Sequence, residues 1–221
     1  MSRRKPSGLP IQAPSEVEPH GEVDAHLREQ TLQTTQVYRG HFLDVRSDRV
    51  QLPDGGTAGR EYIVHPGAVM VVPLLDDGRV VIERQWRYPL ARVMLEFPAG
   101  KLDAGELPLQ CAVRELIEET GYRATEWARA GILHNAIAYS NEGIEVWFAR
   151  GLTQGARALD AGEFLEVGAA SQAELEQLAM HGELTDAKTL IGLLWLQNWR
   201  AGRWALQWAR QEDLGVPIMR A

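Results

Sequence analysis

The first hydrophobic pattern along the chain is an alternation of apolar and polar residues. Residues 42–52 alternate in this way, a Pro-Asp-Gly-Gly turn follows, and residues 60–64 resume the pattern. Alternation at every second residue is typical of a strand with one buried face, and a short turn between two such runs predicts an antiparallel hairpin. We therefore expect a small N-terminal antiparallel β-sheet within residues 33–66. Residues 1–32 are rich in proline, serine and glutamate, and we expect a mobile arm there.

After residue 66 the pattern changes to apolar runs and helical periodicities. Short runs rich in valine and isoleucine predict strands, whereas apolar residues spaced three and four apart predict helices. The predicted strands are 68–75, 80–87 and 144–148, and the predicted helices are 108–120, 172–181 and 186–200. We assign these elements to one domain at residues 67–205, followed by a C-terminal tail at 206–221.

Composition narrows the class of protein. The chain has 221 residues, of which 45% are hydrophobic and 24% charged, as is ordinary for a globular protein. A net charge of −7 leaves no broad basic surface for DNA or RNA. No apolar run reaches the roughly 18 residues of a membrane helix, and the single cysteine, Cys111, cannot form an intrachain disulfide. We expect a cytoplasmic protein without nucleic-acid or membrane partners, in which Cys111 is a small spacer rather than a nucleophile.

Three glutamates of the helix predicted at 108–120 share one face. At about 100° per residue, Glu118 and Glu119 lie within roughly 60° of Glu115, and the apolar residues lie on the opposite side. Like charges this close repel one another, and two of them also oppose the negative end of the helix dipole. A bound divalent cation would remove both penalties, because Mg²⁺ and Mn²⁺ prefer oxygen ligands. A solvated surface helix is the alternative explanation.

A longer spaced pattern surrounds these glutamates. Gly100 is followed by five residues, then Glu106, then seven residues, then Arg-Glu-Leu-x-Glu-Glu-x-Gly-Tyr at 114–122. This pattern resembles the Nudix box, with Tyr122 where the family usually has an aliphatic residue. The resemblance implies an α/β protein with the Nudix α/β/α sandwich and a mixed sheet. It also implies hydrolysis of the diphosphate bond of a nucleoside diphosphate linked to another moiety, with Mg²⁺, or Mn²⁺ in its place, as cofactor.

The resemblance to the Nudix box assigns roles to single residues. The implied metal ligands are the side chains of Glu115, Glu118 and Glu119 and the backbone carbonyl of Ala99. Arg114 would orient the glutamates through charge-assisted hydrogen bonds, with support from Glu106. Gly100 and Gly121 would serve backbone turns.

Segments outside the box resemble the ADP-ribose pyrophosphatase branch of the family. These segments are ERQWRY at 83–88, LEFPAGK at 95–101 and Ser-Asn-Glu at 140–142. The resemblance implies that Arg87 or Arg84 binds a substrate phosphate and that Glu142 also binds substrate. In this branch the N-terminal sheet is exchanged between two subunits, which implies a homodimer in which Arg60 and Tyr62 face the adenosine end.

The catalytic base and the substrate each have more than one candidate. We prefer Glu163, which follows a glycine in a predicted loop, as the base, with Glu118 or Glu119 as alternatives. The branch typically has a proline where this chain has Ile137. The leading hypothesis is hydrolysis of ADP-ribose to AMP and ribose 5-phosphate. Another nucleoside diphosphate sugar or a damaged nucleoside triphosphate is the alternative substrate, and a module that binds without cleaving is the alternative class.

Overall fold

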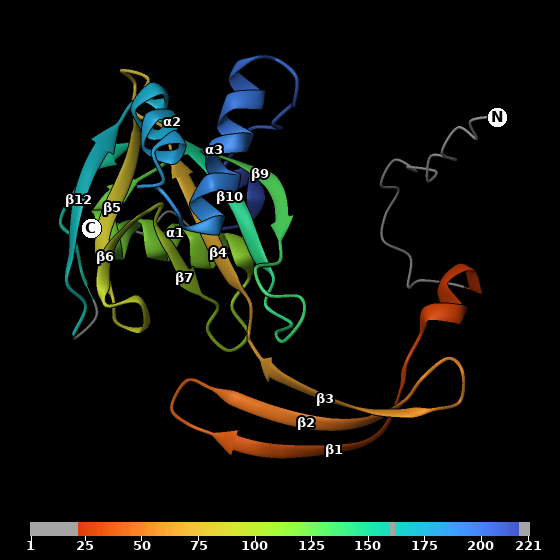
Figure 1. The fold of residues 1–221 in the computed structure, drawn as a ribbon. Coiled ribbons are helices and arrows are strands. Elements are labelled where there is room, and N and C mark those ends of the chain that lie inside the picture. The colour runs from red at the N-terminus through yellow and green to blue at the C-terminus, as the bar shows by residue number, and fades with distance from the viewer. Residues whose placement is uncertain (1–21, 160–161, 217–221) are drawn as a thin grey trace.

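The computed structural model describes residues 22–159 and 162–216, which form a layered body and a projecting N-terminal sheet (Figure 1). The strands are β1 (Gln30–Arg39), β2 (Asp44–Gln51), β3 (Thr57–Val64), β4 (Ala68–Pro73), β5 (Val80–Arg87), β6 (Arg92–Glu96), β7 (Ala99–Lys101), β8 (Tyr122–Arg123), β9 (Glu126–Leu133), β10 (Ile144–Arg150), β11 (Thr153–Gln154), β12 (Leu165–Ala170) and β13 (Ala209–Arg210). The helices are α1 (Pro108–Thr120), α2 (Gln172–Met180) and α3 (Ala187–Arg200), with short 3-10 turns at Glu22–Leu27, Tyr88–Leu90 and Glu212–Leu214.

A five-stranded sheet divides the body into two apolar cores. Its order is β13-β9-β10-β4-β7, in which β10 and β4 run parallel and the other neighbours are antiparallel. Strand β4 is buried along its whole length, with Val69 and Val71 facing α1 and Met70 and Val72 facing α2 and α3. A strand covered on both faces needs a continuous apolar run, because successive side chains point to opposite sides. The predicted α/β/α sandwich with a mixed sheet is confirmed.

Helix α1 has the bounds predicted from its pattern. Pro108 occupies the first turn, where a missing N–H costs nothing, and the helix ends at Gly121, whose φ of 77° is left-handed. The Gly121 N–H donates to the carbonyl of Ile117 at 2.9 Å. The apolar face packs against β4 and β10 through Leu109, Val113 and Leu116. This packing turns the opposite, glutamate-bearing face away from the core.

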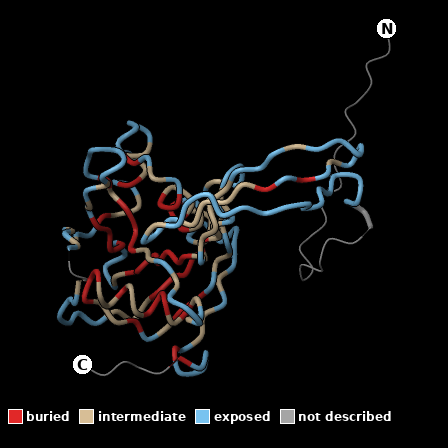
Figure 2. Tube along the Cα trace, turned by 90° about the horizontal axis from the view of Figure 1, so that it is seen from below, coloured by how far each residue is buried: buried red, intermediate tan, exposed pale blue. Residues whose placement is uncertain are grey.

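The N-terminal sheet contains three strands rather than the predicted hairpin of two. The unpredicted strand β1 pairs with β2 and begins at Gln30, inside the segment predicted as an arm, whose residues 1–21 lie outside the described part of the chain. All ten residues of β1 are exposed, and the sheet projects from the body (Figure 2). One attachment is the Ile63 N–H, which donates to the Tyr139 carbonyl at 2.8 Å. The sheet therefore has little core of its own.

The C-terminal segment after α3 packs onto the body as far as it is described. Strand β13 lies in residues predicted to be a tail, and it pairs with β9, a strand that the sequence pattern did not predict. Val216 is buried against the α1 core, and residues 217–221 lie outside the described part. Among the helices in residues 22–159 and 162–216, none combines the length and apolar character that a bilayer crossing requires.

Candidate active site

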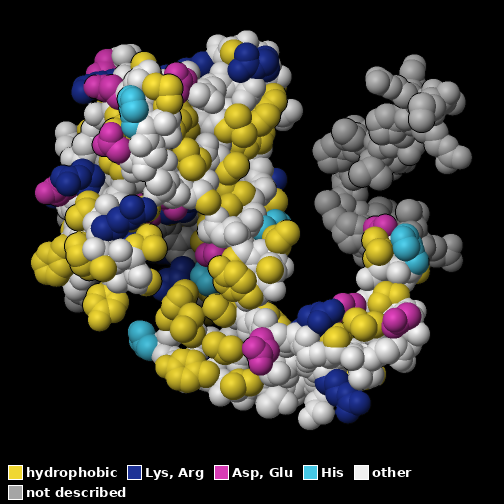
Figure 3. Space-filling model, viewed as in Figure 1, with side chains coloured by type: hydrophobic (Ala, Val, Ile, Leu, Met, Phe, Trp, Pro, Cys, Tyr) yellow, Lys and Arg dark blue, Asp and Glu magenta, His cyan; other side chains and the backbone are white. Residues whose placement is uncertain are grey.

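A cavity of about 560 Å³ opens where α1, β5, β7 and the start of α3 approach one another. Figure 3 shows the body hollowed on the face seen in Figure 1, with charged side chains around the hollow. Acidic side chains lining the cavity are Glu115, Glu118, Glu119, Glu142, Glu163, Asp103 and Asp186, and basic ones are Arg87, Lys101, Arg114 and Lys188. The three glutamates of the box and the predicted base Glu163 thus face one space.

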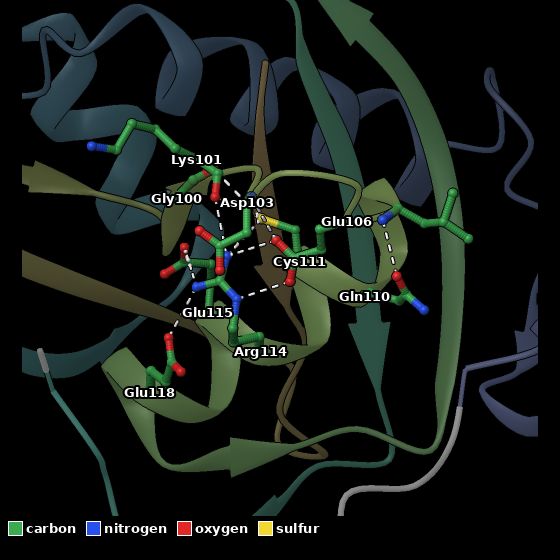
Figure 4. A network of polar contacts seen from close by, with 10 residues as sticks. Gly100, Lys101, Asp103, Glu106, Gln110, Cys111, Arg114, Glu115 and Glu118 are labelled. Atoms are coloured by element: carbon green, nitrogen blue, oxygen red, sulfur yellow. Dashed lines mark hydrogen bonds and ion pairs between the residues drawn. The ribbon is translucent and has the colours of Figure 1, made fainter. Parts of the chain in front are cut away.

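Arg114 holds the glutamate face of α1 in place (Figure 4). Its guanidinium donates to Glu106 through two bonds of 2.9 Å, to Glu115 at 2.8 Å and to Glu118 at 3.0 Å. It also donates to the Lys101 carbonyl at 3.0 Å, which ties α1 to the loop that precedes it. Charge-assisted bonds of this kind are short and directional. The carboxylates of Glu115 and Glu118 are therefore held together by one guanidinium nitrogen, Nη1 of Arg114.

Gly100 makes room for the Glu115 carboxylate. A Cβ atom at Gly100 would lie 1.8 Å from Glu115 Oε1 and 1.9 Å from Glu115 Cδ. Gly100 is absent from the residues with positive φ, whereas Gly121 is among them. The prediction that both glycines serve turns is therefore right for Gly121 and wrong for Gly100. Gly100 is required because only a glycine lets a carboxylate lie against the backbone at this point.

Burial and mutual repulsion raise the pKa values of Glu83, Glu115 and Glu119, which we call the acidic wall of the site. Burial raises the pKa of Glu115 to about 7, although the charge and hydrogen bond of Arg114 act in the opposite direction. Burial and the neighbouring Glu83 and Glu115 raise the pKa of Glu119, whose carboxylate accepts the Ala99 N–H at 3.0 Å. The pKa of Glu83 is raised by burial and by Glu96. This wall lacks sufficient positive charge for all its carboxylates to ionise.

The donors of the acidic wall fit a hard divalent cation. Oxygen ligands from carboxylates are what Mg²⁺ and Mn²⁺ require, and a cation would offset both the burial and the repulsion that raise these pKa values. Glu83 is 1% exposed and its Oε2 is buried without a hydrogen-bond partner. Within residues 22–159 and 162–216, no three Asp, Glu, His or Cys side chains already converge at metal-binding distance. Arg114 holds two of the three candidate ligands, so binding a cation requires them to turn.

A basic cluster, Arg87 and Lys188, lines the same cavity as the glutamates of α1. Arg87 donates to Glu96 through Nε at 2.6 Å and through Nη2 at 2.7 Å. The Lys188 ammonium, at the start of α3, donates to the same carboxylate. Glu96 is only 2% exposed, and its pKa, which burial raises, is brought below its usual value by Arg87 and Lys188. Arg87 remains 40% exposed and faces the cavity.

The two arginines left open as phosphate ligands lie on opposite faces of β5. Arg87 shares a face with Glu83 and lines the cavity, whereas Arg84 points outward and pairs with Glu166 of β12. Period-two alternation explains the separation, because the two positions are three residues apart in one strand. Of the two candidates, the structure brings only Arg87 into the cavity.

The remaining predicted substrate residues lie at and beyond the cavity edge. Glu142 lines the cavity and lies 3.5 Å from His65 Nε2, and burial lowers the pKa of His65. Arg60 lies on β3 in the projecting sheet, bonded to Glu29, and does not line the cavity. Tyr62 donates to Asp48 on the neighbouring strand at 3.1 Å. Arg60 and Tyr62 therefore stand apart from the site of their own chain.

Cys111 lies beneath the acidic wall and takes no part in it as a charged group. The residue is fully buried, and its thiol donates to the Lys101 carbonyl at 3.3 Å. Burial raises the pKa of the thiol, which keeps it protonated. A buried, neutral thiol supports the prediction of a spacer rather than a nucleophile.

Sequence reasoning missed several residues of the site, among them Glu83, Lys188 and His65. Glu83 and Lys188 are charged and buried, and Lys188 and His65 line the cavity. The signal for Glu83 was a carboxylate next to the apolar run at 80–82, in a strand whose neighbours are buried. Lys188 and His65 carried no such local signal, because α3 and the end of β3 reach the cavity only through tertiary packing.

The chain is similar in sequence to known protein domains and characterised proteins. The NUDIX domain model matches residues 64–190, and the model of the nucleoside diphosphate sugar hydrolase N-terminal domain matches residues 29–63. An ADP-ribose pyrophosphatase of Bacillus subtilis is 36% identical over 77% of this chain and 94% of its own length. A methanol dehydrogenase activator of Bacillus methanolicus is 35% identical over 76% of this chain and 92% of its own.

A solved structure has the same fold. The crystal structure of an ADP compounds hydrolase superposes with a TM-score of 0.72, covering 80% of this chain and 97% of that one at 24% identity. The residues matched by the NUDIX domain model make up more than half of the described chain. They include helix α1 with its glutamates, Gly100 and Arg87. The chain is therefore a member of the Nudix hydrolase family.

Proposed function

We propose that the protein hydrolyses ADP-ribose to AMP and ribose 5-phosphate in a reaction that depends on a divalent cation. The observation that carries the proposal is one cavity lined both by the carboxylates of Glu115, Glu118 and Glu119 and by the guanidinium of Arg87. A diphosphate in this cavity would meet a cation-binding face and a guanidinium together. The matched N-terminal domain and the ADP-ribose pyrophosphatase relative support a nucleoside diphosphate sugar as substrate. We place the reaction in the cytoplasm, where the single thiol stays reduced.

The chain's own residues would bind and orient the reactants. Arg87 would bind a phosphate of the substrate through the N–H groups that Glu96 does not use, and Glu142 would bind at the cavity edge. Arg114 would hold the carboxylates of Glu115 and Glu118 in position through its hydrogen bonds. Glu163 would accept the proton of the attacking water, whose oxygen bonds to phosphorus as the bridging phosphorus–oxygen bond breaks.

We propose Mg²⁺ as the cation, with Mn²⁺ as a substitute. Glu115, Glu118 and Glu119 would hold it, and the carbonyl of Ala99, which adjoins the Glu119 carboxylate, would join them. When bound, the cation would neutralise diphosphate charge and lower the pKa of a water molecule.

A second candidate substrate is another nucleoside diphosphate sugar. The observation in its favour is Ile137, which is 83% exposed in the loop before Ser140. A proline there would fix φ, and Ile137 leaves the loop free to accept a different sugar. The described matches to a nucleoside diphosphate sugar domain suit either substrate.

We further propose that two chains form the working enzyme. Strand β1 of the N-terminal sheet is exposed along its whole length and carries the exposed apolar side chains Leu32, Val37 and Tyr38. A three-stranded sheet with so little core gains stability only by packing on another surface. In a dimer that exchanges these sheets, Arg60 of one chain would reach the cavity of the other.

A substrate panel tests the proposed function. Purified protein is incubated with Mg²⁺ and ADP-ribose, other nucleoside diphosphate sugars or oxidised nucleoside triphosphates, and AMP and sugar phosphates are quantified. We expect ADP-ribose to give AMP and ribose 5-phosphate, and turnover of another sugar with ADP-ribose untouched would reject the substrate. Glu119→Gln keeps the side-chain shape and removes the charge, so full activity of that variant would reject the metal assignment.

A further inference from the structure

The start of α3 holds the strand that anchors the cavity arginine. Asp186 caps the helix by accepting from the Thr189 N–H at 2.9 Å and from the Thr189 hydroxyl at 2.6 Å. The same hydroxyl accepts the Phe97 N–H at 3.0 Å, one residue after Glu96. Lys188 lies between Asp186 and Thr189 in the sequence, and its ammonium donates to the carboxylates of Glu96 and Asp186. Helix α3 is thus fastened to β6 at the residue that binds Arg87.

The charges in this cluster balance only when Lys188 is present. Arg87 and Lys188 carry two positive charges, and Glu96 and Asp186 carry two negative ones. Asp186 also faces the α3 N-terminus, where the helix dipole stabilises a negative charge. Without Lys188, Arg87 alone would have to neutralise the negative charge of the buried Glu96 carboxylate. A guanidinium neutralised in this way attracts a phosphate weakly, because a buried carboxylate is poorly screened by water.

We propose that Lys188 is a positioning residue that neutralises Glu96 and thereby keeps the guanidinium of Arg87 available to a substrate phosphate. The inference rests on the proposed function, since it concerns the same cavity and its diphosphate. Lys188 itself is 8% exposed, and its ammonium forms ion pairs with Glu96 and Asp186, so it acts through Glu96 rather than by covering the substrate. Its effect therefore requires Arg87.

A double-mutant cycle tests this dependence. Lys188→Met, Arg87→Met and the double variant are compared for kcat and KM with the substrate that turns over. The same proteins, free of metal, are titrated with inorganic pyrophosphate by calorimetry, a probe common to every nucleoside diphosphate sugar. Lys188→Arg restores the charge and Lys188→Gln restores only a hydrogen bond. Arg129→Met, which breaks the surface pair with Glu145, is the matched control.

We expect Lys188→Met to weaken pyrophosphate binding and kcat/KM about tenfold to hundredfold, the usual effect of losing a charged hydrogen bond. Lys188→Arg should stay within about threefold of the wild type by the same measure, and Lys188→Gln should resemble Lys188→Met. In the Arg87→Met background, Lys188→Met should change little.

Additive losses in the cycle would overturn the inference, as would wild-type behaviour of Lys188→Gln or absence of pyrophosphate binding by the wild type. If Lys188→Met fails to fold, judged by its thermal midpoint, the comparison of Lys188→Arg with Lys188→Gln decides alone. Failure of ADP-ribose as substrate would reject the proposed function without affecting the pyrophosphate titrations. The two ideas therefore fail by different measurements.

Discussion

Gly100→Ala is the most direct probe of the acidic wall. The added Cβ would lie 1.8 Å from Glu115 Oε1 and 2.5 Å from Oε2, so the carboxylate must retreat by about 1.5 Å to reach van der Waals contact. The retreat breaks its 2.8 Å bond to Arg114 and moves a candidate metal ligand. The backbone itself accepts alanine, because Gly100 has no positive φ.

The expected loss can be given a magnitude. Displacement of a catalytic group by about 1 Å costs roughly a hundredfold in rate, which is about 2.7 kcal/mol of activation free energy. We expect kcat/KM of Gly100→Ala to fall by about a hundredfold or more, with a rise in the Mg²⁺ concentration that gives half-maximal rate. The free energy of unfolding should change little, because alanine lowers the conformational entropy of the unfolded chain, and this gain offsets part of the stability lost with the ion pair.

The assay is AMP release over a Mg²⁺ titration, with thermal unfolding of the same samples. Gly168→Ala in β12 is the matched control, because a Cβ there meets nothing within 4 Å and the residue also lacks a positive φ. If Gly100→Ala retained kcat/KM within about threefold of the wild type while Gly168→Ala behaved alike, the close-approach argument would be refuted.

Three further predictions follow from the site and the projecting sheet. Burial raises the pKa of Glu115 from 4.5 to about 7, so the neutral side chain stabilises the fold at low pH and this contribution is lost as pH rises through about 7. Metal-free protein should therefore lose up to about 3 kcal/mol of unfolding free energy between pH 5 and 8, measured by urea titration, and Mg²⁺ should reduce that loss. Glu163→Gln should lower kcat by about a hundredfold or more with little change in KM, whereas Glu166→Gln, at the exposed pair with Arg84, should leave both unchanged; equal effects of the two variants would exclude Glu163 as the base. Mixing inactive Arg60→Ala and Glu119→Gln subunits should restore AMP release if the N-terminal sheets are exchanged, because one site of the mixed dimer then has both residues intact; no recovery after subunit mixing, verified by light scattering, would contradict the exchange.

Local pattern was sufficient to predict α1 and its acidic face. Pro108 and Gly121 set the two ends by chemistry that acts within a few residues, and the apolar spacing set the buried side. Because that side is buried, the three glutamates must lie on the opposite side of the helix. Their shared cavity with Arg87 and Glu163 could not be deduced in this way, since it depends on how separate strands and loops are brought together.

The residues that the sequence left open or missed depend on tertiary context. Strand parity separates Arg84 from Arg87, but it does not say which face lines the cavity, because that depends on how the sheet packs in the fold. Lys188 meets Glu96 only because α3 packs onto β6, 92 residues away in sequence. The role of Gly100 was misjudged because glycine serves both turns and close approach, and only the position of Glu115 distinguishes the two.

Strand β5 changes its surroundings halfway along its length. Val80 and Ile82 belong to the apolar core and Val81 is buried, whereas the positions that follow include the buried carboxylate of Glu83 and Arg87, which lines the cavity. Changes in the first half should therefore register as lost folding and changes in the second half as lost turnover. Evolution could vary the substrate by altering one end of this strand while the other end keeps the domain intact.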